Sequence, residues 1–120
     1  VMLVKDLIKQ VGVNVETMTK EESLEEIRGA FVGDVLSHVM ANAKPGFVWV
    51  TVQTHENVIA VASLLDVACV IVCQRELPPE TCRRAADQGV TLLWSADDAF
   101  HVAGRIYGAL AANPKASGQP

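Results

Sequence analysis

The centre of the chain is almost free of charge. Between Gly29 and Cys73, the Asp, Glu, Lys and Arg residues are confined to four positions: Asp34, Lys44, Glu56 and Asp66. Residues 16–28, by contrast, are rich in charged side chains. A run so poor in charge has to be covered on both faces, as the strands of a parallel sheet are. The pattern therefore predicts a buried central sheet with solvated segments around it.

Length and composition narrow the class of protein. The chain has 120 residues, is 50% hydrophobic and carries a formal net charge of −4, which favours one folded domain over disorder. We expect this domain to span residues 1–112 and residues 113–120 to form a flexible tail. The longest stretch without a charged residue, Pro45–His55, is far shorter than the roughly 20 apolar residues of a membrane span. The sequence therefore predicts no membrane partner.

Other partners and compartments follow from charge and cysteine usage. Basic residues are scattered and form no stripe, so we expect no nucleic-acid partner. The three cysteines are an odd number, and residues 1–6 lack a basic region followed by an apolar core, as a signal peptide would have. These features favour a cytoplasmic location.

Helical and strand-like patterns alternate along the chain. They predict an α/β fold, a three-layer α/β/α arrangement with a mostly parallel central sheet of about four to six strands. The expected strands are Val13–Thr17 (an edge strand), Ile27–Val32, Phe47–Val52, Ala68–Cys73 and Val90–Trp94. The expected helices are Leu3–Val11 ending at Gly12, a short turn capped by Thr19 with Glu22, and helices opening at Asp34, Thr54, Pro78 and Ser95. Lys44-Pro45-Gly46 predicts a turn.

Each helix is expected to bury an apolar face. The predicted buried positions are Val35, Leu36, Val39 and Met40; Val58, Ile59, Ala62, Leu64 and Leu65; Cys82, Ala85 and Ala86; and Phe100, Ala103, Tyr107 and Leu110. In the last helix, His101 and Arg105 are expected to face solvent. Both tryptophans, Trp49 and Trp94, lie in strand patterns and are predicted to belong to the core.

Polar residues follow the predicted strands at their carboxyl ends, where open α/β sheets bind ligands. They are Gly33 and Asp34, then Gln53, Thr54 and His55, then Gln74 and Arg75, and finally Ser95 and Asp97. This set suits a small polar or phosphorylated ligand. Asp34, Thr54 and Ser95 are also residue types that cap helices, so capping and ligand binding are both open at these three positions.

Three of these side chains have alternative roles. His55 is placed in the first turn of a helix, which favours the neutral imidazole, and is either a ligand or catalytic group or a hydrogen-bonded surface histidine. Arg75 is either a phosphate ligand or an exposed loop arginine. Gln53 needs a hydrogen-bond partner if it is buried.

Metal, nucleophile and phosphate-loop motifs are missing from the sequence. Cys69 and Cys73 share a strand face but lie roughly 13 Å apart at strand rise, too far to hold one ion. There is no CxxC, HExxH, GxxxxGK[ST] or GxGxxG pattern. We therefore predict no metal, no cofactor and no assigned catalytic residue. The missing motifs favour a protein that is not an enzyme.

Three runs resemble the DRTGG domain family over about residues 2–111: Ala30–Asn42, Trp49–Asn57 and Val61–Asp66. The family is similar to the N-terminal domain of HPr kinase/phosphorylase. The resemblance implies a regulatory or dimerising module that in places binds adenine nucleotides, without known catalytic activity. The positions that match are Gly29, Asp34, Asn42, Gln53, Thr54, His55 and Asn57. The naming motif differs: Leu24-Glu25 and Arg28-Gly29-Ala30 stand where the family has Asp-Arg and Thr-Gly-Gly.

Three functional hypotheses follow. The first is a homodimeric regulatory or accessory module that binds a partner protein or a small effector such as an adenine nucleotide. The second is a small enzyme acting on a phosphorylated metabolite through Asp34, His55 and Arg75. The third is an accessory subunit of a hydrogenase-type redox complex, because short members of the family are associated with such systems.

Overall fold

A computed structural model describes residues 1–18 and 20–112. The elements in chain order are α1 (Val4–Val11), β1 (Asn14–Thr17), α2 (Lys20–Ser23), β2 (Gly29–Val32), α3 (Leu36–Asn42), β3 (Phe47–Thr51), α4 (Asn57–Leu65), β4 (Cys69–Cys73), α5 (Pro79–Gln88), β5 (Leu92–Ser95) and α6 (Ala99–Ala111). The expected cap at Thr19 and the expected tail at residues 113–120 lie outside the described residues.

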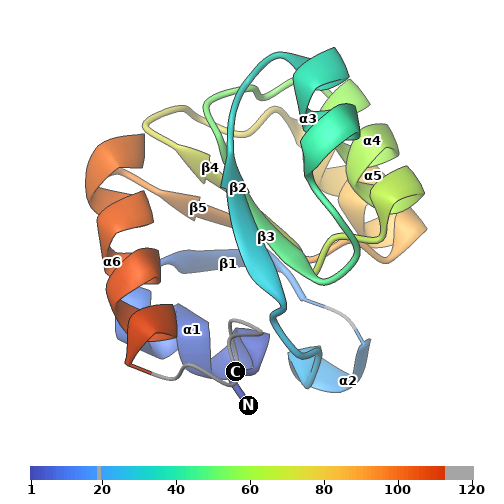
Figure 1. Ribbon diagram of the computed structural model, residues 1–120. Coiled ribbons are helices and arrows are strands. Elements are labelled where there is room, and N and C mark those ends of the chain that lie inside the picture. Colours follow the sequence, from blue (N-terminus) through green and yellow to red (C-terminus); the bar gives the residue numbers. More distant parts are fainter. Residues whose placement is uncertain (19, 113–120) are drawn as a thin grey trace.

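The strands form one mixed sheet in the order β1-β5-β4-β3-β2. Strands β2 to β5 are parallel, and β1 pairs antiparallel with β5 at one edge. Helices α3, α4 and α5 cover one face of the sheet, and α1 and α6 cover the other (Figure 1). The predicted α/β fold with a mostly parallel sheet and an edge strand near residues 13–17 is confirmed.

The charge-poor centre of the chain forms the middle of this sheet. All five residues of β4 are buried, as are Val48, Trp49 and Val50 of β3. Val48 and Val50 belong to the apolar cluster under α1 and α6, whereas Trp49 belongs to the cluster under α3, α4 and α5. Because alternate side chains of β3 and β4 enter opposite clusters, these two strands have no solvated face that could carry charge.

The turn residues behave as their chemistry predicts. Gly12 ends α1 at φ 75°, and its N–H donates to the Ile8 carbonyl at 3.0 Å. In the turn before β3, Gly46 has φ 81° and the Phe47 N–H donates to the Lys44 carbonyl at 3.0 Å. Proline followed by a glycine at positive φ is typical of a type II turn.

The buried face of α6 is not the one predicted. The structure buries Val102, Ile106 and Leu110, while Phe100 and Tyr107 are 80% and 76% exposed. The prediction was therefore wrong for both aromatic residues and right for Leu110. This helix has apolar residues around most of its circumference, so two stripes with helical spacing compete, and periodicity alone does not choose between them.

Other helices also bury narrower stripes than predicted. Val39 is the buried residue of α3, whereas Val35 and Met40 are 64% and 48% exposed. Leu64 of α4 is 71% exposed, and Ala86 of α5 is exposed too. These three helices form an outer layer on one side of the sheet, so each contacts the core along one line of side chains.

The predicted helical turn after β1 has the opposite hand. Residues 20–23 have φ values between 49° and 60°, which is the left-handed region. Lys20 anchors this turn through Nζ, which lies 3.0 Å from Glu25 and 3.2 Å from Asp66. The hydrogen bond to Glu25 raises the pKa of Lys20 above its ordinary value. Left-handed backbone is unfavourable for residues with a Cβ, so this turn carries local strain.

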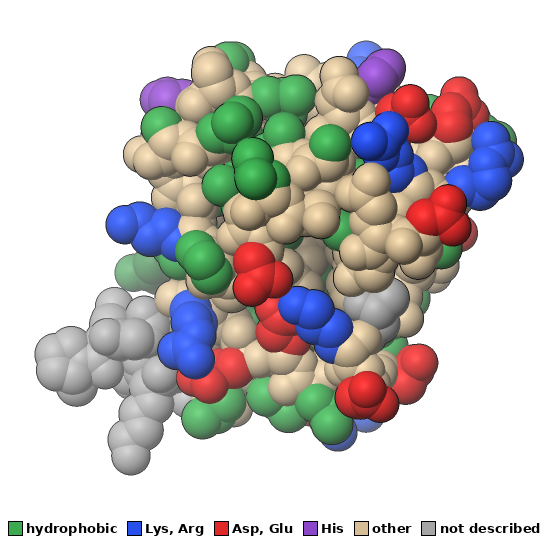
Figure 2. Space-filling model, turned by 90° about the vertical axis from the view of Figure 1, so that its right-hand side faces the viewer, with side chains coloured by type: hydrophobic (Ala, Val, Ile, Leu, Met, Phe, Trp, Pro, Cys, Tyr) green, Lys and Arg blue, Asp and Glu red, His purple; other side chains and the backbone are tan. Residues whose placement is uncertain are grey.

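On the face of the molecule shown in Figure 2, hydrophobic side chains gather in one area, and acidic and basic side chains lie side by side in another. Helices α3 and α4 contain no Asp, Glu, Lys or Arg, so the charges of this layer come from α5 and the loops. One such pair is Arg84 with Glu56, whose atoms Nη1 and Oε1 lie 3.7 Å apart. No helix in residues 1–18 and 20–112 is long and apolar enough to cross a membrane.

Candidate functional site

A crevice opens at the carboxyl ends of β4 and β5. The connection after β4 leads to α5 on one face of the sheet, and the connection after β5 leads to α6 on the other face (Figure 1). Adjacent loops that leave a parallel sheet in opposite directions create the crevice in which α/β proteins bind ligands. A cavity of about 470 Å³ lies here, lined by Glu16, Gln74, Arg75, Glu76, Leu77, Trp94, Ser95 and Ala96.

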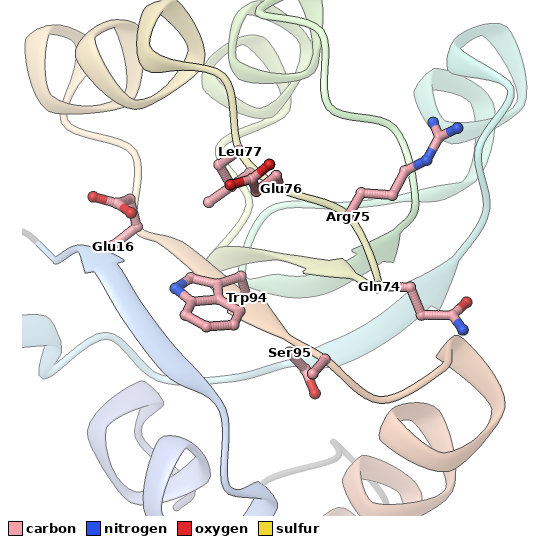
Figure 3. A pocket seen from close by; sticks show the side chains of 8 residues that line it. Glu16, Gln74, Arg75, Glu76, Leu77, Trp94 and Ser95 are labelled. Carbon is pink, nitrogen blue, oxygen red and sulfur yellow. The ribbon is translucent and has the colours of Figure 1, made fainter.

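Trp94 forms the floor of this cavity (Figure 3). Its neighbours Leu92, Leu93 and Ser95 are buried, but the indole is half-buried, so the prediction that Trp94 belongs to the core was wrong. The prediction for Trp49 is confirmed, because that side chain is fully buried and its Nε1 donates to the Gly33 carbonyl at 2.9 Å.

Gln74 and Arg75 border the crevice on the β4 side. Gln74 has φ 67°, and its N–H donates to the Ser95 carbonyl at 2.8 Å, which joins the two loops at their base. Arg75 is exposed, and its Nη1 lies 3.5 Å from the Val52 carbonyl, at the outer limit of a hydrogen bond. The Arg75 side chain points away from Trp94 in Figure 3.

Two carboxylates lie on the Trp94 side of the cavity. Glu16 comes from edge strand β1, and Glu76 comes from the β4–α5 loop (Figure 3). Glu16 also lies near Cys82 of α5. Burial and then the Glu16 charge raise the pKa of the Cys82 thiol. The cavity thus has an acidic end with an aromatic floor and a guanidinium at its opposite rim.

A second polar cluster lies at the ends of β2 and β3. Oδ1 of Asp34 accepts hydrogen bonds from the Thr51 hydroxyl and the Val52 N–H, each at 2.8 Å. Gln53 is exposed, so its amide could be satisfied by solvent, and it donates to the Asp34 carbonyl at 3.1 Å. Asp34 and Arg75 both contact the main chain of Val52, Asp34 at its N–H and Arg75 at its carbonyl, so the two side chains lie at the same segment.

The predicted helix caps differ from the observed ones. Asp34 does not cap α3, whose N-cap residue is Val35, and Thr54 does not cap α4, whose N-cap residue is Glu56. The N-cap of α6 is Asp98, which accepts from the His101 N–H at 2.8 Å. The side chains of Asp34 and Ser95 bond locally, to β3 and to the Asp97 N–H respectively.

The segment before α4 is organised by its own hydrogen bonds. His55 precedes the helix, and its Nδ1 accepts a hydrogen bond from the Asn57 N–H at 3.0 Å. The Thr54 carbonyl accepts from the Thr81 hydroxyl at 2.6 Å, which ties the segment to α5. The enzyme hypothesis requires Asp34, His55 and Arg75 to act at one point. The hydrogen bond described for His55 is to Asn57 of α4 and not to Asp34 or Arg75.

Gly29 and Asn42 lie apart from the crevice. Gly29 opens β2, and a Cβ at this position would stand 2.7 Å from the Phe47 ring, so a glycine is needed for packing. Asn42 is in the last turn of α3, where its Nδ2 donates to the His38 carbonyl at 2.9 Å. Of the eight predicted ligand-binding residues, Arg75 lines the cavity.

Five lining residues of the cavity were not among the residues singled out from the sequence for the site: Glu16, Glu76, Leu77, Trp94 and Ala96. Glu76 is next to Arg75, and Trp94 is the last residue of a predicted strand, so proximity to the carboxyl end was a usable signal for both. Glu16 had no such signal, because its place depends on β1 pairing with β5.

Comparison with known proteins shows the fold alone. No family model matches the sequence, and no curated protein matches it. The fold is similar to a crystal structure of the CBS and DRTGG domains of the regulatory region of Clostridium perfringens pyrophosphatase, complexed with the activator diadenosine tetraphosphate. The TM-score is 0.66 at 13% identity, over 86% of this chain. The match spans 45% of the length of that structure's chain.

Proposed function

We propose that the chain is a regulatory module without catalytic activity, and that it binds an adenine nucleotide in the crevice between β4 and β5. The observation that carries the proposal is the partly buried Trp94 side chain, which lines a cavity of ligand size. The similarity to a regulatory region that binds diadenosine tetraphosphate supports the same class of effector.

Each end of the cavity suits one part of a nucleotide. The Trp94 indole offers a stacking surface for a base, an interaction worth about 1–3 kcal/mol. Glu16 and Glu76 offer acceptors for the exocyclic amine of adenine. The long bond between Arg75 and the Val52 carbonyl leaves the guanidinium available to pair with phosphate.

Binding is tested by tryptophan fluorescence and thermal unfolding with AMP, ATP and diadenosine tetraphosphate, each with and without Mg²⁺. We expect quenching and a raised unfolding temperature, both lost in Trp94→Ala. Arg75→Ala should weaken binding about tenfold, as expected for the loss of one charge-assisted contact. Arg83→Ala removes an exposed arginine of α5 outside this cavity and should bind like the wild type. A protein unaffected by all three nucleotides would refute the proposal.

We also propose that the module is a homodimer. The support is the pair of large hydrophobic side chains that α6 leaves exposed, Phe100 and Tyr107. Exposed aromatic residues gathered on one element are typical of protein–protein contacts. Sedimentation equilibrium of the full chain tests this, and a mass of one chain at every concentration would contradict it.

A further inference from the structure

The two edges of the sheet are built from different residues. Edge strand β1 reads Asn-Val-Glu-Thr, and its pairing with β5 is interrupted by a bulge between Val15 and Thr17. Edge strand β2, at the other end of the sheet, reads Gly-Ala-Phe-Val and pairs with β3 in continuous register (Figure 1). Charged residues and bulges keep edge strands from pairing with other chains. Strand β1 has both of these features, and β2 has neither.

The main-chain groups of Ala30 and Val32 point away from the sheet. At the end of β2, the Gly33 N–H donates to the Val50 carbonyl of β3 at 3.1 Å. Successive residues of a strand direct their main-chain groups to opposite sides, so Phe31 also bonds to β3, whereas Ala30 and Val32 present theirs at the outer edge. Both residues are exposed, and within residues 1–18 and 20–112 no strand pairs with β2 on this side.

The segment just before β2 shows that this edge accepts an extended chain. Residues 2–4 form an antiparallel bridge with residues 25–27, in which the Ile27 N–H donates to the Met2 carbonyl at 2.9 Å. The Arg28 N–H points to the other side and donates to the turn before β3 at 2.9 Å. The outer edge is therefore covered by extended backbone up to the start of β2 and open along β2 itself.

An apolar groove accompanies the open edge on the α6 side of the sheet. Its volume is about 440 Å³, its lining includes Ala30, Val32 and Val50 of the sheet with Ala103 and Ile106 of α6, and no lining residue carries a formal charge. A strand added to β2 would direct every second side chain to this side of the sheet. Its main chain would meet the edge while those side chains enter the groove.

We propose that β2 and this groove bind an extended segment of another protein, which adds a strand to the sheet and places large apolar side chains from alternate positions in the groove. Unpaired N–H and carbonyl groups in a row favour a peptide over a lipid or an aromatic ligand, because a peptide offers donors and acceptors at strand spacing. This surface shares no lining residue with the crevice at β4 and β5, so the inference goes beyond the nucleotide site.

Two occupants from this chain fit the groove less well. A second copy that paired through β2 would bring its own Ala30 and Val32 to the groove side, and these side chains are too small to fill the hollow. Residues 113–120 contain no large apolar side chain. A partner segment with leucine or phenylalanine at alternate positions supplies what both of these occupants lack.

The test uses the full chain and labelled synthetic peptides in which threonine alternates with leucine or phenylalanine, with a lysine at each end. Fluorescence anisotropy measures binding. Replacing the large residues by alanine should weaken binding at least about tenfold, because the groove then stays unfilled. N-methylation of alternate amides removes the donors along one edge of a peptide. Methylation of one alternate set should abolish binding, and methylation of the other set should preserve it.

Variants of the protein locate the site. Ala30→Pro removes an outward N–H and no bond to β3, and Ala103→Leu fills the groove, so each should weaken peptide binding about tenfold. Ala86→Leu makes the second change at an exposed position of α5 and should bind like the wild type. Circular dichroism verifies that each variant is folded. In the wild type, bound peptide should slow hydrogen exchange of the Ala30 and Val32 amides.

Three results would overturn the proposal. The first is failure of both the leucine and the phenylalanine peptide to bind. The second is binding that Ala30→Pro and Ala103→Leu both leave unchanged. The third is slow exchange of the Ala30 and Val32 amides before any peptide is added, which would mean that a second copy or residues 113–120 already cover the edge. None of these measurements involves a nucleotide, so this proposal and the proposed function fail separately.

Discussion

The Asp34 carboxylate accepts a hydrogen bond from the Thr51 hydroxyl at 2.8 Å. Thr51 is 1% exposed, so this hydroxyl has no solvent to bond to. The same carboxylate oxygen also accepts the Val52 N–H. One side chain from the loop after β2 therefore holds the carboxyl end of β3 in place, next to the main-chain atoms that Arg75 approaches.

Replacing Asp34 tests this link. We expect Asp34→Ala to lower the free energy of unfolding by about 1–3 kcal/mol, because the Thr51 hydroxyl loses its acceptor while it stays buried. Asp34→Asn keeps an oxygen acceptor and should lose less. Urea denaturation followed by circular dichroism measures both, and equal losses in the two variants would contradict the role of the acceptor.

The cap of α6 predicts a dependence of stability on pH. The backbone and side-chain hydrogen bonds from His101 hold the pKa of Asp98 below its ordinary value. The folded state therefore favours the ionised carboxylate. Its contribution to stability is complete above the ordinary aspartate pKa and is lost as the pH falls through the lowered folded-state pKa.

Asp98→Ala should therefore be less stable than the wild type near neutral pH, and the difference should shrink on acidification. Urea midpoints of both proteins across the acid range measure this. The exposed carboxylate Asp87 of α5 offers a matched control, since Asp87→Ala should show no such dependence. A difference that stays constant down to the lowest pH would count against the cap.

Glu16 should control the reactivity of Cys82. Burial and the Glu16 carboxylate raise the pKa of this thiol, which lowers its thiolate fraction at a given pH. Glu16→Gln should therefore speed alkylation of Cys82 by iodoacetamide at mildly alkaline pH. Glu80→Gln, on the same helix as Cys82, should react like the wild type. Peptide mass spectrometry identifies the modified cysteine.

Cys69 and Cys73 should not interfere with that measurement. Burial raises the pKa of Cys69 to about 12 and that of Cys73 to about 11, so both stay protonated. An alkylation rate at Cys82 that is the same with and without Glu16 would show that the carboxylate does not act on the thiol.

Replacing two glycines that have open space around them by alanine should change the free energy of unfolding in opposite directions. Gly104→Ala should raise the free energy of unfolding by roughly 0.5–1 kcal/mol, because its backbone is helical. Gly12→Ala should lower it by roughly 1–2 kcal/mol, because Gly12 has φ 75°. Urea unfolding in a Tyr107→Glu background excludes any effect of dimerisation, and a shared sign would contradict the backbone argument.

The sheet was predictable because its signals are local. The uninterrupted apolar run of β3 and β4, the turn at Pro45-Gly46 and the stop at Gly12 each depend on a few neighbouring residues. The candidate site was predictable in part. Arg75 follows a strand in sequence and lines the cavity, whereas Glu16 reaches it through the pairing of Asn14 with Trp94, far along the chain.

Periodicity and turn chemistry thus specified the strands, their mostly parallel direction and the helices between them, since these patterns act within one element. Long-range packing settled which stripe of α6 is buried, where Trp94 lies and which loops diverge into a crevice. In each of these cases the alternatives have nearly the same local free energy, as the two apolar stripes of α6 do. The difference in free energy between them arises from contacts with the sheet, and those contacts exist only once the chain has folded.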